Sequence, residues 1–224
     1  LKEGITKSSE GLYTIEYSDL DLDIVGGNLT LKDILLKNDS TAYIKLDSAK
    51  KAPNTRFEAR ADRLAISGVS VWGILVNKKI DIGTIALDSL KAKVLLRDRP
   101  YNKDKKKEKD LYAMIKDRFK SLGVDKFRAN GIDLELEDLN KEGTKPKKVN
   151  GVDLAVDNFL IDEHSGTDSK RFLYSKDISL HIPGFKTNLE GAPYEFSFKD
   201  LKFSSKNRNA QISKLSLQPT LSLE

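Results

Sequence analysis

The chain has 224 residues, of which 38% are hydrophobic and 33% charged, and its formal net charge is +5. This length allows one large domain or two small ones, and the low apolar share favours a shape with much surface per residue over a compact enzyme. The absence of cysteine excludes disulfides, thiol catalysis and cysteine metal sites. With only two histidines, there is almost no material for a nucleophilic triad.

The N-terminal region alternates apolar and polar residues. Residues 13–18 alternate aromatic or aliphatic side chains with polar ones, and residues 19–24 alternate aspartate with leucine or isoleucine. Because successive side chains of a strand point to opposite faces, each stretch predicts a strand with one apolar side. Residues 26–28, Gly-Gly-Asn, predict a hairpin turn. The return strand runs from 29 to 36, with a bulge expected at Asp33, where the phase slips.

The alternation continues along the chain. It predicts further strands near residues 42–47, 56–66, 79–88, 90–97, 124–136, 149–159, 172–182, 194–203 and 210–217. Strands at hairpin spacing, each with one apolar side, predict an antiparallel meander with one covered face and one wet face. The expected fold class is therefore mainly β, of the α+β kind. It is an elongated, curved antiparallel β-sheet with two short helices on its apolar face.

Two segments depart from the period of two and predict the helices. Residues 69–76 form the first and carry the single tryptophan, Trp72. Residues 109–122 form the second, with apolar residues at helical spacing and Gly123 as the expected C-terminal cap. Each helix is followed by a strand unit that ends in an aspartate.

These helix-plus-strand units predict an internal repeat within a single domain of residues 1–224. The units are residues 69–98 and 109–138, and they align at an offset of roughly forty residues, which is a period typical of stacked architectures. Val94 then corresponds to Leu134, and Leu96 to Leu136. We expect each unit to bury its apolar side against its neighbours.

No apolar run is long enough to span a bilayer, and the chain does not open with a signal peptide. It begins at Leu1, and its only methionine is Met114. We therefore expect a processed or truncated piece from which a targeting or anchoring segment has been removed.

Three stretches carry a resemblance to a known family. GLYTIEYSDLDLDIVGGNLTLKDILLKND (residues 11–39) resembles the N-terminal region of the AsmA-like superfamily. IDIGTIALDSLKAKVLLRD and IKDRFKSLGVDKFRANGIDLELED (residues 80–98 and 115–138) resemble its recurring unit of a helix, a strand, a turn and a strand that ends in an acid. The chain is far shorter than the large members, and its lysine-rich loops are not a family hallmark.

The resemblance implies a Gram-negative envelope protein that is anchored in the inner membrane and extends into the periplasm. Members fold as a long curved β-sheet with an apolar interior and are thought to conduct phospholipid towards the outer membrane. The implied role is binding or guiding of a phospholipid or another acyl lipid, in outer-membrane biogenesis or lipid homeostasis. The family supplies no site residues at fixed positions.

The residues that we expect to face such a lipid share the apolar side of the predicted strands. They are Ile15, Leu22, Leu31, Val94, Leu96, Leu134 and Leu136. An apolar face that helices cover only in part would form a groove for acyl chains. A fully sealed face would be an ordinary core. The alternative function is then a non-catalytic envelope scaffold whose exposed edge strands recruit protein partners.

The most charged segment spans residues 97–110. Its basic residues could bind a phosphate head group, and they are Lys103, Lys105, Lys106 and Lys107. The other interpretation is a solvated loop that leads into a helix. A second basic run, residues 141–148, has the same two interpretations and lies where a hairpin loop is expected. Nucleic acid is not an expected partner, because the aromatic residues fall in the apolar rows instead of alternating on a basic face.

Residues 162–168, with sequence DEHSGTD, combine carboxylates with His164, but their spacing matches no metal-binding loop and predicts a turn. His181 alternates with apolar neighbours and should face solvent. No glycine-rich phosphate loop is present. We expect no metal, no cofactor and no enzymatic activity, with a hydrolase that uses an unrecognised carboxylate pair as a third possibility.

Overall fold

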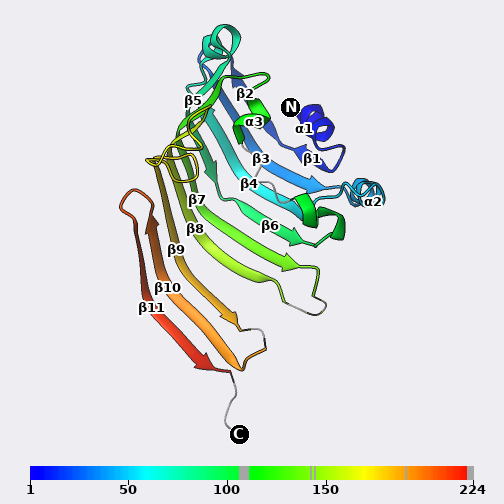
Figure 1. The fold of residues 1–224 in the computed structure, drawn as a ribbon, viewed down its shortest axis with the longest axis vertical. Helices are drawn as coiled ribbons and strands as arrows, with labels where there is room; N and C mark the ends of the chain where they lie inside the picture. The colour runs from blue at the N-terminus through cyan, green and yellow to red at the C-terminus, as the bar shows by residue number, and fades with distance from the viewer. Residues whose placement is uncertain (106–110, 142, 144, 190, 221–224) are drawn as a thin grey trace.

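The computed structural model describes residues 1–105, 111–141, 143, 145–189 and 191–220. Eleven strands form one mixed sheet, so the predicted mainly β fold class is confirmed (Figure 1). The strands are β1 (Tyr13–Glu16), β2 (Asp19–Asp23), β3 (Asn28–Asn38), β4 (Thr55–Ser67), β5 (Lys79–Asp88), β6 (Lys91–Leu96), β7 (Ser121–Asp138), β8 (Lys147–Ile161), β9 (Asp177–Asn188), β10 (Tyr194–Ser204) and β11 (Asn209–Pro219). The short helical segments are α1 (Lys2–Ser8), α2 (Ser40–Ser48), η1 (Gly73–Asn77), η2 (Pro100–Lys105) and α3 (Leu111–Ile115).

The strands occupy the order β1-β3-β4-β5-β7-β8-β9-β10-β11. The two strands missing from this order share a position with another strand: β2 with β1, and β6 with β5. β1 and β2 follow one another along β3, and β5 and β6 follow one another between β4 and β7. Every junction is antiparallel except one, because β5 and β6 both pair with β7 in parallel. The prediction of a purely antiparallel meander is wrong at this junction. Parallel neighbours need a long crossover connection, here residues 97–120.

The two proposed repeat units meet at this parallel junction. A helix-plus-strand unit followed by a second copy brings equivalent strands side by side and in the same direction. The sheet register joins Val94 to Leu136 and Ala92 to Leu134. Residues that neighbour each other in space are therefore 42 apart, slightly more than the offset at which the two sequences align.

Three elements differ from prediction. Residues 42–47 form α2 and not a strand, because the Asp39 side chain caps the helix by accepting from the Ala42 amide at 2.8 Å. Residues 172–176 precede β9 in a turn, in which Leu173 and Tyr174 have positive φ. The second predicted helix is only the five-residue α3, and Gly123 lies within β7 instead of capping it.

The first predicted helix is present as η1, which ends at the left-handed residue Lys78. Large apolar side chains of both helical segments remain exposed, including Trp72 at 75% and Met114 at 66%. Neither segment therefore uses these side chains to cover the sheet.

A line of left-handed residues crosses the sheet, and we call this line the crease. Its members with positive φ are Asp33, Ser89, Gly131, Gly151, Asp200 and Lys214. They occupy corresponding positions in neighbouring strands. Ser89 lies beside Gly131, for example, because the β5–β7 and β6–β7 pairings continue on either side with one register. The slip in phase predicted at Asp33 is thus confirmed as part of a larger feature.

The crease reverses the alternation of side chains, so that apolar residues three positions apart share one face. Leu31 and Ile34 belong to one apolar cluster, and Ala129 and Ile132 belong to another. At the crease, each of the nine strand positions has two apolar residues separated by two residues that are polar, glycine or proline. The pairs are Tyr17 and Leu20, Leu31 and Ile34, Ala61 and Leu64, Leu87 and Leu90, Ala129 and Ile132, Val149 and Val152, Ile182 and Phe185, Phe198 and Leu201, and Ile212 and Leu215.

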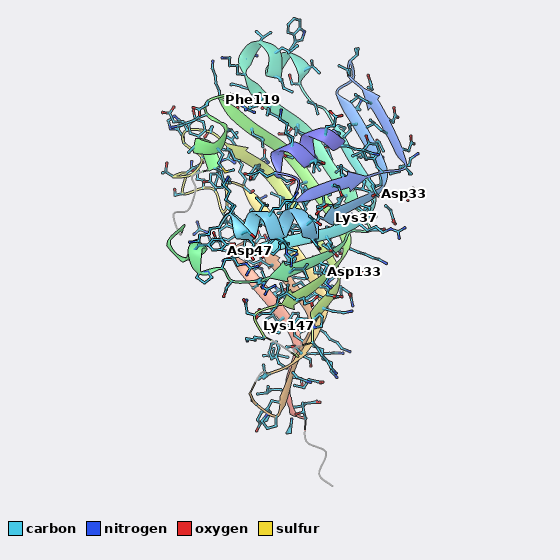
Figure 2. The ribbon with its side chains drawn as sticks, turned by 90° about the vertical axis from the view of Figure 1, so that its right-hand side faces the viewer. Asp33, Lys37, Asp47, Phe119, Asp133 and Lys147 are labelled. Carbon is cyan, nitrogen blue, oxygen red and sulfur yellow. The ribbon has the colours of Figure 1, made fainter. Side chains whose placement is uncertain are left out.

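A separate cluster at one end of the sheet fixes α2 and η2. Buried Tyr43 from α2 packs with Leu46 and Tyr101. The Tyr101 hydroxyl donates to Asp47 Oδ1 at 2.6 Å, and Arg99 Nη2 lies 2.7 Å from Asp47 Oδ2. Burial, followed by the hydrogen bond to Asp47, raises the pKa of Tyr101 to about 12. Figure 2 labels Asp47 on α2.

Candidate functional site

One face of the sheet carries a continuous apolar surface, which we call the apolar face. Two clusters make up its centre, one around buried Leu31, Ile34 and Ala61 and the other around buried Ala129 and Ile132. Leu87 and Leu90 pack against both clusters. The clusters therefore meet along the crease and extend the apolar face from β3 across to β9.

The seven residues predicted to face lipid all lie on this face. Leu31 is buried at its centre, and Ile15 packs against the same cluster. Leu22 pairs with Leu29 on the edge strand, and Leu134 packs in the second cluster. The remaining three, Val94, Leu96 and Leu136, lie on β6 and β7, on the C-terminal side of the crease residues Ser89 and Gly131.

A row of these residues crosses three strands in register. Phe57 on β4 pairs with Val94 on β6, and Val94 pairs with Leu136 on β7. Phe57 is 45% exposed and Leu136 is 38% exposed. Large apolar side chains at the centre of a sheet are normally buried when a second layer covers them. This row is therefore open to solvent.

The total surface supports the same conclusion. The accessible area is 15346 Å² for a chain of 25.1 kDa, whereas a compact monomer of this mass exposes about 10,000 Å². The described residues include only twelve buried hydrophobic side chains, and most of the sheet's apolar residues are half-buried. The molecule is thus essentially one layer thick, and the apolar face lacks the second layer that usually completes a β-rich domain.

Carboxylates satisfy the backbone of the crease on the opposite, polar face. Asp153 Oδ1 accepts from the Gly131 amide at 2.9 Å, and Asp133 Oδ1 accepts from the Gly151 amide at 3.1 Å. His181 lies with Nδ1 3.4 Å from Asp153 and Nε2 3.0 Å from Asp200. The side chain predicted to face solvent therefore connects two strands.

Asp200 is also 3.2 Å from the Lys202 ammonium group. Hydrogen bonds from Lys202 and then His181 hold the pKa of Asp200 below its ordinary value of 3.8. These polar groups stabilise one another and the backbone, so we assign them a structural role.

The sheet divides below the crease, at a place that we call the fork. β8 pairs with β9 only through residues 153–157 and 177–181. Beyond these pairs, residues 147–152 continue beside β7 and residues 182–188 continue beside β10. Figure 1 shows β8 and β9 diverging towards their lower ends. Among the described residues, β8 and β9 thus form no strand pairs with each other at the fork.

Two hollows open at the fork. The larger has a volume of about 800 Å³ and is lined by Lys148, Asn150, Pro183, Gly184, Phe185, Lys186, Ser197, Phe198, Lys199, Lys214, Ser216 and Gln218. The smaller has a volume of about 350 Å³ and is lined by Leu96, Leu136, Asp138, Lys141, Lys145, Lys147, Thr187, Asn188 and Leu189. Both volumes fall in the range of about 300 to 1,000 Å³ that is typical of ligand sites.

The hollows combine lysines with apolar side chains. Four lysines line the larger and three line the smaller, and Asp138 is the only acid among the described residues that line either one. Figure 2 places Lys147 below Asp133, towards the narrow end of the sheet. The smaller hollow includes two of the predicted lipid-facing residues, Leu96 and Leu136.

A third hollow of about 400 Å³ lies on the polar face between β3 and β8. Its charges neutralise one another, because Glu135 lies 3.7 Å from Lys93 and 3.0 Å from Lys148. The hydrogen bond from Lys148 is the main cause that lowers the pKa of Glu135. This hollow therefore offers less free charge to a ligand than the fork does.

The basic patch predicted at residues 103–107 is only partly described. Lys103 and Lys105 lie in η2, and Lys106 and Lys107 fall outside the described residues. The lysines of the fork were not predicted as a group, because they come from four places along the chain, namely the run 141–148 and residues 186, 199 and 214. Only the run 141–148 gave a local signal, and that signal equally fits a plain hairpin loop.

The predicted turn at residues 162–168 is confirmed. Asp162 Oδ1 accepts from the amides of His164 and Ser165 at 3.0 and 2.7 Å. Within the described residues, no three His, Asp or Glu side chains come together as a metal site would require. No helix among all the residues that the structure describes is both long enough and apolar enough to cross a membrane.

Comparison with known proteins adds no family assignment. No family model matches the sequence, and no curated protein matches it.

Proposed function

We propose that this chain is the β-sheet domain of an AsmA-like protein of the bacterial envelope, and that its apolar face binds or guides an acyl lipid. The observation that carries the proposal is the open row of Phe57, Val94 and Leu136 within a continuous apolar face. An uncovered apolar surface of this extent marks a binding site for an apolar partner. In this proposal the full-length protein is anchored in the inner membrane, and the domain lies in the periplasm.

Acyl chains suit the face because it is long and its two central clusters are built of apolar side chains. Each methylene group removed from water contributes about 0.8 kcal/mol, so ten of them contribute about 8 kcal/mol before the cost of ordering the chain. A lipid would supply the second layer that the sheet lacks. Its position across several strands would also let it move along the face without breaking hydrogen bonds.

The test is native mass spectrometry of the gently purified protein, followed by organic extraction and by uptake of a fluorescent fatty acid. We expect bound lipid at a defined stoichiometry and saturable uptake. A mass without lipid, together with no uptake, would rule the proposal out.

A matched pair of variants localises the binding. Phe57→Gln with Leu136→Gln places two polar side chains in the open row, at positions exposed enough to tolerate them. Lys79→Gln with Lys126→Gln changes two exposed strand residues away from every hollow described above. We expect the Phe57 and Leu136 double variant to lose most of its uptake of the fluorescent fatty acid. The Lys79 and Lys126 double variant should keep the uptake of the wild type. Equal uptake by both pairs would contradict binding on the apolar face.

The free edge of β11 favours a second candidate function, that of an envelope scaffold. Leu215 and Leu217 on this edge strand are 65% and 58% exposed, and an open edge can add a strand from a partner. This function predicts self-association or partner binding that depends on concentration, without lipid uptake. Sedimentation velocity over a range of concentrations distinguishes the two candidates.

A further inference from the structure

The fork joins a basic surface to an aromatic one. Phe185 and Phe198 line the larger hollow together with Lys199 and Lys214. Their rings pair across β9 and β10 with centroids 5.8 Å apart, and Phe196 stacks against Phe198 at 6.2 Å. Phe185 lies three residues from Ile182, and Phe198 lies three residues from Leu201. Because the crease places residues with this spacing on one face, both rings belong to the apolar face. The residues that line the hollow therefore come from both faces of the sheet.

The lysines at this opening are available to a ligand to different degrees. Lys148 lies 3.0 Å from Glu135, and Lys186 lies 2.8 Å from Glu195. Lys199 and Lys214 come from adjacent strands, and both are exposed. Serines 197 and 216 line the same hollow and pair with each other across β10 and β11. Lysine ammonium groups and serine hydroxyl groups around one hollow can donate hydrogen bonds to the oxygens of a phosphate.

We propose that the fork is the seat of a phosphate-bearing head group, with the acyl chains of the same lipid lying on the apolar face. This inference rests on the proposed function and adds to it the class of lipid, an anionic phospholipid. The smaller hollow supports the same arrangement from the other side of the fork, because lysines surround an apolar floor of Leu96 and Leu136. Because β8 and β9 do not pair beyond Asp153 and His181, no strand ladder closes the sheet between the lysines and the apolar face.

The test compares two fluorescent lipids with identical acyl chains, phosphatidylglycerol and diacylglycerol, and inorganic phosphate as a third probe. In Lys199→Gln with Lys214→Gln, we expect phosphatidylglycerol to bind about tenfold more weakly, because two exposed charge interactions are lost. Diacylglycerol should bind as it does to the wild type. The variant pair Lys79→Gln with Lys126→Gln should bind both lipids unchanged.

A salt titration of the wild type supplies a readout that needs no variant. Phosphatidylglycerol binding should weaken as sodium chloride is raised, since salt screens exposed charges, and diacylglycerol binding should not. Equal salt dependence of the two lipids, or no effect of the two lysine substitutions, would overturn the head-group seat while leaving the proposed function standing.

Two further outcomes distinguish a lipid head group from free phosphate, and failure of the head-group seat from failure of the proposed function. If the wild type binds neither lipid, the proposed function fails and the head-group seat fails with it. If millimolar inorganic phosphate binds with the same dependence on Lys199 and Lys214 but neither lipid does, the fork is a site for the free anion. That result would overturn the proposal that the phosphate at the fork belongs to a lipid.

Discussion

Gly151 and Pro183 face each other at the point where β8 and β9 part, and a Cβ atom built on Gly151 would lie 3.5 Å from Cγ of Pro183. Their register continues the pairing of Asp153 with His181. Proline has no amide proton, so it cannot donate to a ladder at this position. The left-handed conformation of Gly151, with φ of +69°, turns β8 at the same point. The fork therefore begins where one strand lacks a donor and the other changes direction.

Replacing Pro183 with valine should shift the fork towards closure. Valine supplies the missing amide and favours extended backbone, so we expect at least one added pair between β8 and β9. Amide hydrogen exchange should show slower exchange at residues 182–184, and phosphatidylglycerol should bind more weakly. Unchanged exchange at these amides would show that Pro183 does not hold the fork open.

Substitution of Gly131 tests the crease. Its φ is +64°, and a Cβ atom added there meets no atom within 4 Å, so any cost comes from backbone conformation alone. Gly131→Ala should lower the free energy of unfolding by about 1 kcal/mol. Gly131→Asn should cost less, because asparagine adopts left-handed conformations more readily. Urea denaturation of both variants measures the difference, and equal costs would contradict a conformational origin.

Asp200 should make stability depend on acid. Its pKa is lower in the folded chain than its ordinary value of 3.8, so its stabilising contribution is present above that value and is lost as the pH falls through the folded pKa. Asp200→Asn should therefore unfold at lower urea concentration than the wild type at pH 7. The difference should disappear well below pH 3.8. A difference that persisted in acid would point to packing and not to charge.

Tyr101 should make stability depend on alkali in the opposite sense. Its pKa is raised from 10.0 to about 12, so its contribution is complete below pH 10 and is lost as the pH rises through about 12. Tyr101→Phe removes the hydrogen bond to Asp47 and should cost about 1 to 2 kcal/mol at pH 7. A phenolate absorbance titration of the wild type should contain a late component that this variant lacks.

Much of the sheet follows from the sequence, because period-two alternation depends only on which face of a strand is buried. The helix α2 was missed because Ala42, Ile44 and Leu46 look like an alternating row, while the decisive signal was the capping aspartate, Asp39. The crease could have been predicted from the apolar residues that recur three positions apart in strand after strand, with polar residues, glycine or proline between them. Only the slip at Asp33 was recognised, since a single strand cannot show that its neighbours share the irregularity.

The candidate site was less predictable than the fold. The apolar face could be assigned strand by strand, but its openness depends on the absence of a second layer, which no local pattern encodes. The fork depends on Pro183 lying opposite Gly151, and these residues are far apart in sequence. Lys199 and Lys214 likewise become neighbours only through the pairing of β10 with β11.

The single parallel junction divides the sheet into two units of different folding character. β1 to β6 and β7 to β11 are each connected by antiparallel pairs between strands close in sequence, whereas β5 and β6 meet β7 only after a 42-residue separation is closed. Closing a longer loop costs more entropy and slows the contacts that depend on it. We therefore expect the two units to gain amide protection first and the β5–β7 seam to gain it last during refolding. The seam is then the place where the two units can separate without either one losing its own strand pairs.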